Sequence, residues 1–139
     1  MTARDLMRRD VKSVGPEMSV WSALAVMRQE GLGHLFVTED EQMRGVLSNR
    51  DYRRMLEWAR PDGTLQEIFR VSVAQIMTPR EQLVVVGPET PLEDVADLVL
   101  KRRVACIPVV DLLNRPLGLI TKYDVLSALL GLVRERRAG

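Results

Sequence analysis

Two short motifs in this sequence place a hydroxyl and a carboxylate three residues apart. Ser48 precedes Asp51 in the first half of the chain, and Thr121 precedes Asp124 in the second half. At a helix start such a pair can form a capping box, in which each side chain accepts a hydrogen bond from a nearby backbone N–H. The same groups also suit a ligand, because a carboxylate accepts hydrogen bonds from paired hydroxyls and a helix start binds phosphate. The spacing alone leaves both interpretations open.

His34 and Cys106 take equivalent positions, each just before a predicted strand, and both are residue types that can bind a metal or act in catalysis. The sequence holds one histidine and one cysteine, so no second residue of either type completes a ligand set or a nucleophile–base dyad. It also lacks a phosphate-binding glycine loop and a nucleophile elbow. We therefore predict no catalytic residues, no metal and no enzymatic activity.

The composition argues against several classes of partner. A formal net charge of +1, from 20 basic and 19 acidic residues, gives no general attraction to nucleic acid or to an anionic membrane. The longest apolar stretch, residues 125–133, is far shorter than the roughly 20 residues that span a bilayer. A single cysteine forms no internal disulfide, and the sequence shows no secretory signal pattern. We expect a cytoplasmic protein that binds neither nucleic acid nor membrane.

The chain repeats itself, and the repeated segments keep their order and nearly their spacing. Residues 3–7 match 73–77, 14–17 match 86–89, 20–27 match 92–99, 31–37 match 103–109, and 45–51 match 118–124. The offset between matched segments drifts only slightly, as small insertions in loops would produce. A turn-forming stretch at residues 60–63 ends the helix before it. We therefore predict two units, residues 1–70 and residues 71–139.

Hydrophobic spacing predicts the same elements in each half. The i, i+3, i+4, i+7 pattern of an amphipathic helix occurs at Val20, Ala23, Leu24 and Met27, and again at Leu92, Val95, Ala96 and Val99. Short apolar runs predict a hairpin at residues 35–47 and another at 107–120. A closing helix begins at Ser48 and another at Thr121. The second closing helix carries an apolar stripe that is either core or a subunit interface, formed by Leu126, Leu129, Leu130 and Val133.

These motifs, in this order and twice over, resemble a pair of cystathionine-beta-synthase (CBS) domains. Each half ends in Gly-hydrophobic-hydrophobic-Ser/Thr-x-x-Asp, and residues 76–79 and 107–111 also look like that family. The resemblance covers nearly the whole chain. It implies an α+β fold of two helix-strand-helix-strand-strand-helix units, packed through their sheets with pseudo-twofold symmetry into one compact module.

The resemblance also implies a regulatory ligand, held in clefts between the two units. The ligands of the family are adenosyl compounds such as AMP, ADP, ATP or S-adenosylmethionine, and none acts as a catalytic cofactor. By the family pattern, Asp51 and Asp124 bind the ribose hydroxyls, and Ser48 and Thr121 bind phosphate. The implied ligand residues are Ser13, Val14, Gly33, His34, Leu35, Ser48, Arg50 and Asp51 in the first unit, and Val85, Val86, Ala105, Cys106, Ile107, Pro108, Thr121, Tyr123 and Asp124 in the second.

The two halves differ at positions that bear on binding. Arg50, beside Asp51, is either a phosphate ligand or an exposed arginine at a helix start, and Tyr123 stands at the equivalent position in the second half. Phe36 stands where the second half has Pro108, so the wall of the first cleft is expected to be bulkier. We expect the first site to have more affinity for phosphate, and the second to have the adenine wall more typical of the family.

Two functions remain compatible with the sequence. The first is a sensor whose ligand changes the module and is read by an unidentified regulated protein. The second is a ligand-free interaction or dimerisation scaffold, in which the aspartates only cap helices. In either case we expect a homodimer, because the apolar stripe of the last helix, together with Met55 and Trp58, exceeds what one small module buries.

Overall fold

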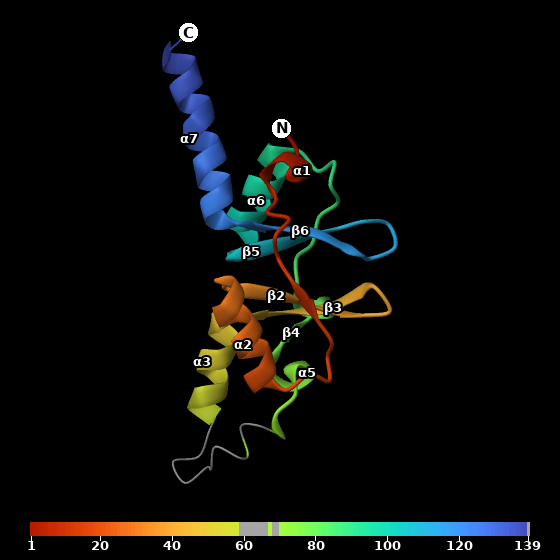
Figure 1. The fold of residues 1–139 in the computed structure, drawn as a ribbon. Helices are drawn as coiled ribbons and strands as arrows, with labels where there is room; N and C mark the ends of the chain where they lie inside the picture. Colours follow the sequence, from red (N-terminus) through yellow and green to blue (C-terminus); the bar gives the residue numbers. More distant parts are fainter. Residues whose placement is uncertain (59–66, 68–69, 139) are drawn as a thin grey trace. The chain divides into compact units, whose positions relative to one another are not determined.

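The computed structural model describes residues 1–58, 67 and 70–138 and divides the chain into two compact units. One unit comprises Val11–Leu83 and is called the β1–β4 unit here. The other combines Met1–Asp10 with Val84–Gly139 and is called the β5–β6 unit. Both contain helices and strands, which confirms the mixed α+β class (Figure 1). The predicted turn at residues 60–63 lies outside the described residues.

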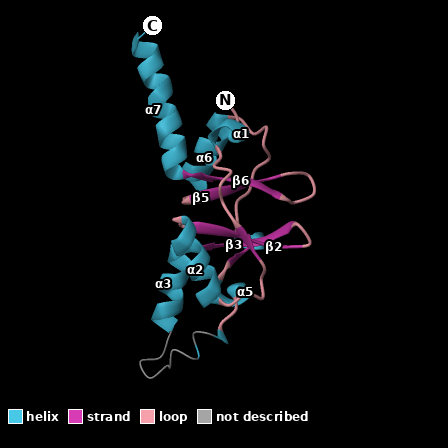
Figure 2. Ribbon diagram, viewed as in Figure 1, coloured by secondary structure: helices cyan, strands magenta, loops and turns pink. Residues whose placement is uncertain are grey.

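The β1–β4 unit is a four-stranded sheet with helices on one face (Figure 2). Its strands follow the order β1-β2-β3-β4; β1 runs parallel to β2, and the other neighbours are antiparallel. The elements are β1 (Ser13–Val14), α2 (Val20–Glu30), β2 (His34–Glu39), β3 (Gln42–Ser48), α3 (Asn49–Trp58), α5 (Val73–Ile76), β4 (Thr78–Pro79) and the 3-10 helix η1 (Arg80–Gln82).

The β5–β6 unit repeats this arrangement with fewer paired residues. Its elements are α1 (Ala3–Leu6), α6 (Leu92–Arg102), β5 (Cys106–Val110), β6 (Pro116–Thr121) and α7 (Lys122–Ala138). The two strands form an antiparallel hairpin. Single bridges extend it on both sides, since Val86 pairs in parallel with Val109 and Arg8 pairs antiparallel with Leu119. The strand order of the first sheet is thereby reproduced.

Each short helix packs in the unit built mainly from the other repeat. In Figure 1, α1 lies beside α6, and the backbone N–H of Ala3 donates to the carbonyl of Thr90 at 2.8 Å. Correspondingly, the N–H of Val73 donates to the carbonyl of Met18 at 2.8 Å. The compact units therefore differ from a division at residue 70. A repeat is defined by the order of residues along the chain. A compact unit is defined by packing, and the apolar side chains of each short helix pack in the core of the other repeat.

The two hydrophobic cores contain the predicted helix stripes. Val20, Ala23 and Met27 are buried in one core, and Leu92 and Val95 in the other. The short helices complete these cores: Ala3 and Leu6 join the second, and Val73 and Ile76 join the first. In contrast, the stripe on α7 stays exposed, with exposed fractions of 59% at Leu126, 39% at Leu129, 49% at Leu130 and 48% at Val133. The core alternative for this stripe is wrong within the single chain.

A glycine lets the segment after each short helix approach the sheet edge closely. A Cβ at Gly45 would lie 2.5 Å from the carbonyl oxygen of Thr78 and 2.8 Å from the Met77 sulfur. At Gly118 it would lie 2.7 Å from the Met7 sulfur and 2.8 Å from the carbonyl oxygen of Arg8. Backbone atoms cannot give way as a flexible side chain can, so any larger residue forces the segment off the sheet.

We expect Gly45→Ala and Gly118→Ala each to lower the free energy of unfolding by about 1–3 kcal/mol, because the added methyl group overpacks the contact. Urea denaturation followed by circular dichroism measures this. Gly15→Ala is the control, since nothing lies within 4 Å of a Cβ at that position. A control variant that loses as much stability as the other two would contradict the packing argument.

Candidate functional site

In the β1–β4 unit, the strand register brings the predicted ligand residues to one end of the sheet. Ser13 pairs with Phe36, and His34 pairs with Ser48 across the next strand. The N–H of Asn49, the first residue of α3, donates to the carbonyl of Gly33 at 3.3 Å. The start of β2 therefore lies against the start of α3, with β1 alongside.

In the β5–β6 unit the equivalent residues meet in the same way. Cys106 pairs with Thr121, and the N–H of Lys122 donates to the carbonyl of Ala105 at 3.1 Å. Val86 takes the place of β1, and its N–H donates to the carbonyl of Pro108 at 3.1 Å. Val85, which precedes it, is half-buried.

Several predicted residues contribute side chains to the cores. Val14 and Leu35 pack in one core, and Val86 and Ile107 in the other, with exposed fractions of at most 7%. Since these side chains point into apolar surroundings, such residues have only backbone groups to offer a ligand.

The exchange of phenylalanine for proline changes the parallel pairing. The N–H of Phe36 donates to the carbonyl of Lys12 at 2.9 Å, which supports β1 as a two-residue strand. Pro108 has no N–H, so this bond cannot form in the β5–β6 unit. The pairing there is the single bridge between Val86 and Val109.

Asp51 is a buried carboxylate, 2% exposed, at the third position of α3. Its Oδ2 accepts hydrogen bonds from the Ser48 N–H at 2.9 Å and from the Ser48 hydroxyl at 3.2 Å. Its Oδ1 accepts from the Arg54 guanidinium and from the Thr78 hydroxyl, the latter at 3.1 Å. The carboxylate thus ties the helix start to the segment that contains β4.

Asp124 is held similarly at the start of α7. Its Oδ2 accepts hydrogen bonds from the Thr121 N–H at 2.8 Å and from the Thr121 hydroxyl at 2.9 Å. The Thr121 hydroxyl oxygen in turn accepts from the Asp124 N–H at 3.3 Å, which completes a capping box. Oδ1 accepts from Nε of Arg8 at 3.0 Å, and the Asp124 side chain is 13% exposed.

The full capping box is therefore present at Thr121 and Asp124, whereas at Ser48 and Asp51 its carboxylate half is present, because Asp51 accepts from the Ser48 N–H. This geometry does not exclude ligand binding, because a capping carboxylate still has a second oxygen. The use of that oxygen is what distinguishes the two sites.

Three partners of these carboxylates were missed from the sequence: Thr78, Arg54 and Arg8. A signal for two of them was present, since the match between residues 3–7 and 73–77 puts Arg8 and Thr78 at equivalent positions, directly after a methionine. That Arg8 reaches Asp124, 116 residues away in sequence, depends on α1 packing in the β5–β6 unit.

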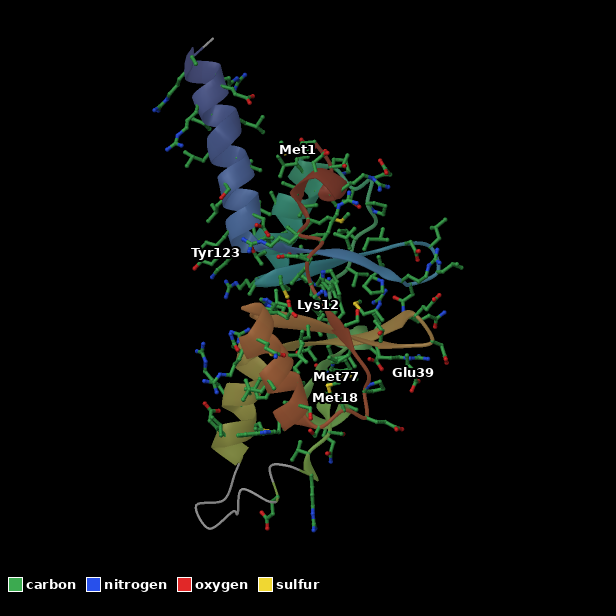
Figure 3. The ribbon with its side chains drawn as sticks, in the orientation of Figure 1. Met1, Lys12, Met18, Glu39, Met77 and Tyr123 are labelled. Carbon is green, nitrogen blue, oxygen red and sulfur yellow. The ribbon has the colours of Figure 1, made fainter. Side chains whose placement is uncertain are left out.

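The residues that follow the capping hydroxyls are exposed. Arg50 is exposed at the start of α3, which fits both alternatives given for it. Tyr123 is 66% exposed on the first turn of α7, where Figure 3 labels it, and the Lys122 ammonium lies 5.6 Å from the centre of its ring. Positive charge is thus available beside both motifs, from Arg50 at one and Lys122 at the other.

Tyr52, next to Asp51, has a structural role. Its hydroxyl donates to the carbonyl of Val20 at 2.6 Å and joins α3 to α2. Burial raises the pKa of Tyr52 from 10.0 to about 12. The stabilisation from keeping this phenol neutral is fully present below pH 10 and is lost as the pH rises toward 12.

His34 and Cys106 are both half-buried at the start of their strands. Over residues 1–58, 67 and 70–138, no group of three or more His, Cys, Asp or Glu side chains is placed to hold a metal ion. Within the same residues, no helix is long and apolar enough to cross a membrane.

An apolar groove of about 480 Å³ lies between α2 and α3. Trp21, Leu24, Met55 and Leu56 line it, with Arg53 among its polar residues. Trp21 is 50% exposed and Leu56 is 60% exposed. The groove is lined by residues of these two helices alone.

Comparison with known families identifies this arrangement. The family model of the CBS domain matches the chain twice, over residues 3–57 and residues 73–131. The chain belongs to the CBS-domain family. The two matches correspond to the sequence repeats, and the structure shows that CBS domains of this chain exchange their first short helices.

The CBS domain-containing protein YhcV of Bacillus subtilis is 26% identical over 124 residues, which cover 89% of this chain and 82% of YhcV. Other curated relatives are longer: the chain spans 22% or 23% of the inosine-5'-monophosphate dehydrogenases and homoserine O-acetyltransferases that it matches.

Solved structures show the same fold. The structure of CBSX2 in complex with AMP is 28% identical and superposes with a TM-score of 0.73, covering 94% of this chain and 97% of CBSX2. The CBS domain pair of MJ0100, in complex with 5′-methylthioadenosine and S-adenosyl-L-methionine, has a TM-score of 0.76 and covers 94% of this chain and 96% of that one. At 20% identity, the MJ0100 comparison shows the fold alone.

We expect Ser48→Ala and Thr121→Ala each to lower the free energy of unfolding by about 0.5–2 kcal/mol, because Thr121→Ala loses a helix cap and Ser48→Ala loses a hydrogen bond to the buried Asp51 carboxylate. Ser127→Ala, at an exposed interior position of α7, is the control and should change stability by less than about 0.5 kcal/mol. Chemical denaturation compares the three variants. Equal losses in all three would argue against capping.

Proposed function

We propose that this CBS-domain protein is a regulatory module that binds an adenine nucleotide or a related adenosyl ligand. The observation that carries the proposal is the placement of a Ser/Thr-x-x-Asp motif at the start of α3 and again at the start of α7, each beside the first residues of a strand. A CBS-domain structure of 28% identity that contains AMP supports the same ligand class.

Different parts of such a site would bind the ribose, the phosphate and the adenine of the ligand. An ionised carboxylate accepts charge-assisted hydrogen bonds from the ribose hydroxyls. The N-terminus of a helix favours a phosphate through its backbone N–H groups and dipole, and α7, with 17 residues, has a full dipole. Backbone groups at Gly33–Leu35 or Ala105–Ile107 would recognise the adenine, because most of the side chains there are partly or fully buried.

AMP is the first ligand to test, with ADP, ATP and S-adenosylmethionine as further members of the class. S-adenosylmethionine is included because the adenosyl ligands that the family resemblance implies extend to one without phosphate. The proposal assigns the chain a regulatory role with no turnover of its ligand, in the reducing cytoplasm that a single cysteine suits.

Regulation requires that the ligand bind one conformation of the module more tightly than another, because only differential affinity shifts an equilibrium. A regulated protein would then recognise the favoured conformation. The alternative function, a ligand-free scaffold, is favoured by a specific observation: the Asp51 carboxylate accepts four hydrogen bonds from the protein itself, without a ligand.

We expect AMP at a hundred times its dissociation constant to stabilise the protein by about 2.7 kcal/mol, since it binds the folded state alone. A thermal-shift panel of AMP, ADP, ATP, S-adenosylmethionine and NADH measures this against GTP. A melting temperature unmoved by every member of the panel would favour the scaffold.

We also propose that the protein is a homodimer. The α7 stripe and the α2–α3 groove leave large apolar side chains exposed, and exposed apolar patches of this kind mark interfaces. In a twofold-symmetric dimer, the same apolar surface of both chains would be buried in one interface.

We expect light scattering at micromolar concentration to give twice the chain mass of 15.8 kDa. Leu126→Glu combined with Leu130→Glu should reduce this to the monomer mass, because charges in an apolar interface are unfavourable. Leu112→Glu, at a fully exposed side chain in the loop between β5 and β6, should leave the dimer intact. A monomeric unmodified protein would refute the proposal.

A further inference from the structure

We propose that the two motif aspartates have different roles. Asp124, together with Arg8, binds the ligand, whereas Asp51 has a structural role and joins the start of α3 to β4. The inference rests on the proposed function and extends it by naming the site and a residue that selects the ligand. It is carried by the number of hydrogen bonds that each carboxylate accepts and by the exposure of the groups that donate them.

Asp51 has no acceptor capacity to spare. A carboxylate offers about four acceptor sites, and Asp51 accepts from the Ser48 N–H, the Ser48 hydroxyl, Arg54 and Thr78. It is also 2% exposed. For a ribose to bind there, existing partners of a buried charge would have to leave, and an unpaired buried charge is costly.

Asp124 keeps capacity on one oxygen. Its Oδ2 is occupied by the cap, but Oδ1 accepts from Arg8 and from no other residue in the described part of the chain. One acceptor site therefore remains on Oδ1. The side chain is 13% exposed, against 2% for Asp51.

The Arg8 partner is also easy to rearrange. Its side chain is 59% exposed, and an ion pair with so exposed a partner contributes little stability. The guanidinium can turn from Asp124 toward a ligand at small cost. The equivalent residue in the β1–β4 unit is Thr78, which carries no charge.

Arg8 has the chemistry to recognise a phosphate next to the ribose. A guanidinium has five N–H donors in a planar fork that matches phosphate, and the contact with Asp124 uses the one at Nε. Lys122, exposed on the first turn of α7, adds a second positive charge nearby. The pair of Arg8 and Asp124 thus fits a ligand that carries both a hydroxyl pair and a phosphate, which is a nucleotide rather than a nucleoside.

The test is calorimetric titration of the full chain with AMP and with adenosine. We expect Asp124→Asn to weaken both ligands by about tenfold or more, because the charged acceptor is lost. Arg8→Gln should weaken AMP by about tenfold and change adenosine less than about twofold, because only the phosphate contact is removed. Arg4→Gln is the matched control: Arg4 lies on the same segment, 49% exposed, and pairs with Glu89 at 3.0 Å. It should leave both affinities unchanged.

Asp51→Asn should lower the urea midpoint of unfolding and leave the AMP affinity of the folded protein unchanged. If this variant fails to fold, Thr78→Val replaces it, since it removes the hydrogen bond from the Thr78 hydroxyl to Asp51 and keeps the aspartate.

AMP binding that survives Asp124→Asn but is lost in Asp51→Asn or Thr78→Val would overturn the inference and leave the proposed function standing. Equal weakening of AMP and adenosine by Arg8→Gln would overturn the role of Arg8. An unmodified protein that binds neither AMP, ATP nor S-adenosylmethionine would refute both proposals.

Discussion

The close approach of a backbone segment to Gly45 and to Gly118 is the constraint on which both candidate sites depend. At each glycine, the segment after a short helix lies so near the sheet edge that no side chain fits between them. This contact places the residue after Met77 or Met7 opposite the carboxylate at the adjoining helix start. Without it, Asp51 would lose Thr78, and Asp124 would lose Arg8.

The capping box and the ligand site are compatible, because they use different oxygens of the same carboxylate. At Asp124 the cap occupies Oδ2 and holds the side chain in one orientation. Oδ1 is then presented at a defined position, which reduces the ordering that a ligand has to impose. A repeated motif can therefore keep its structural role in both repeats while its second oxygen takes different partners.

The two polar environments differ in ways that the motif itself does not show. Asp51 is buried, and it accepts from a cation of its own helix, Arg54, and from the neutral hydroxyl of Thr78, in the segment after α5. Asp124 instead pairs with the exposed cation of Arg8, in the segment after α1. In a duplicated fold, such differences allow one copy to specialise for stability and the other for recognition.

The sequence by itself determined the repeat, the amphipathic helices, the hairpins and the contacts of Asp51 and Asp124 at their helix starts, because each follows from the order and spacing of residues along the chain. The same motifs, repeated in the same order, indicated membership of the CBS-domain family. Only the tertiary structure decided that α1 packs in the β5–β6 unit, that the α7 stripe stays exposed, and that Arg8 pairs with Asp124. These features depend on contacts between residues far apart in the chain, and hydrophobic spacing specifies which side chains need burial but not which core receives them.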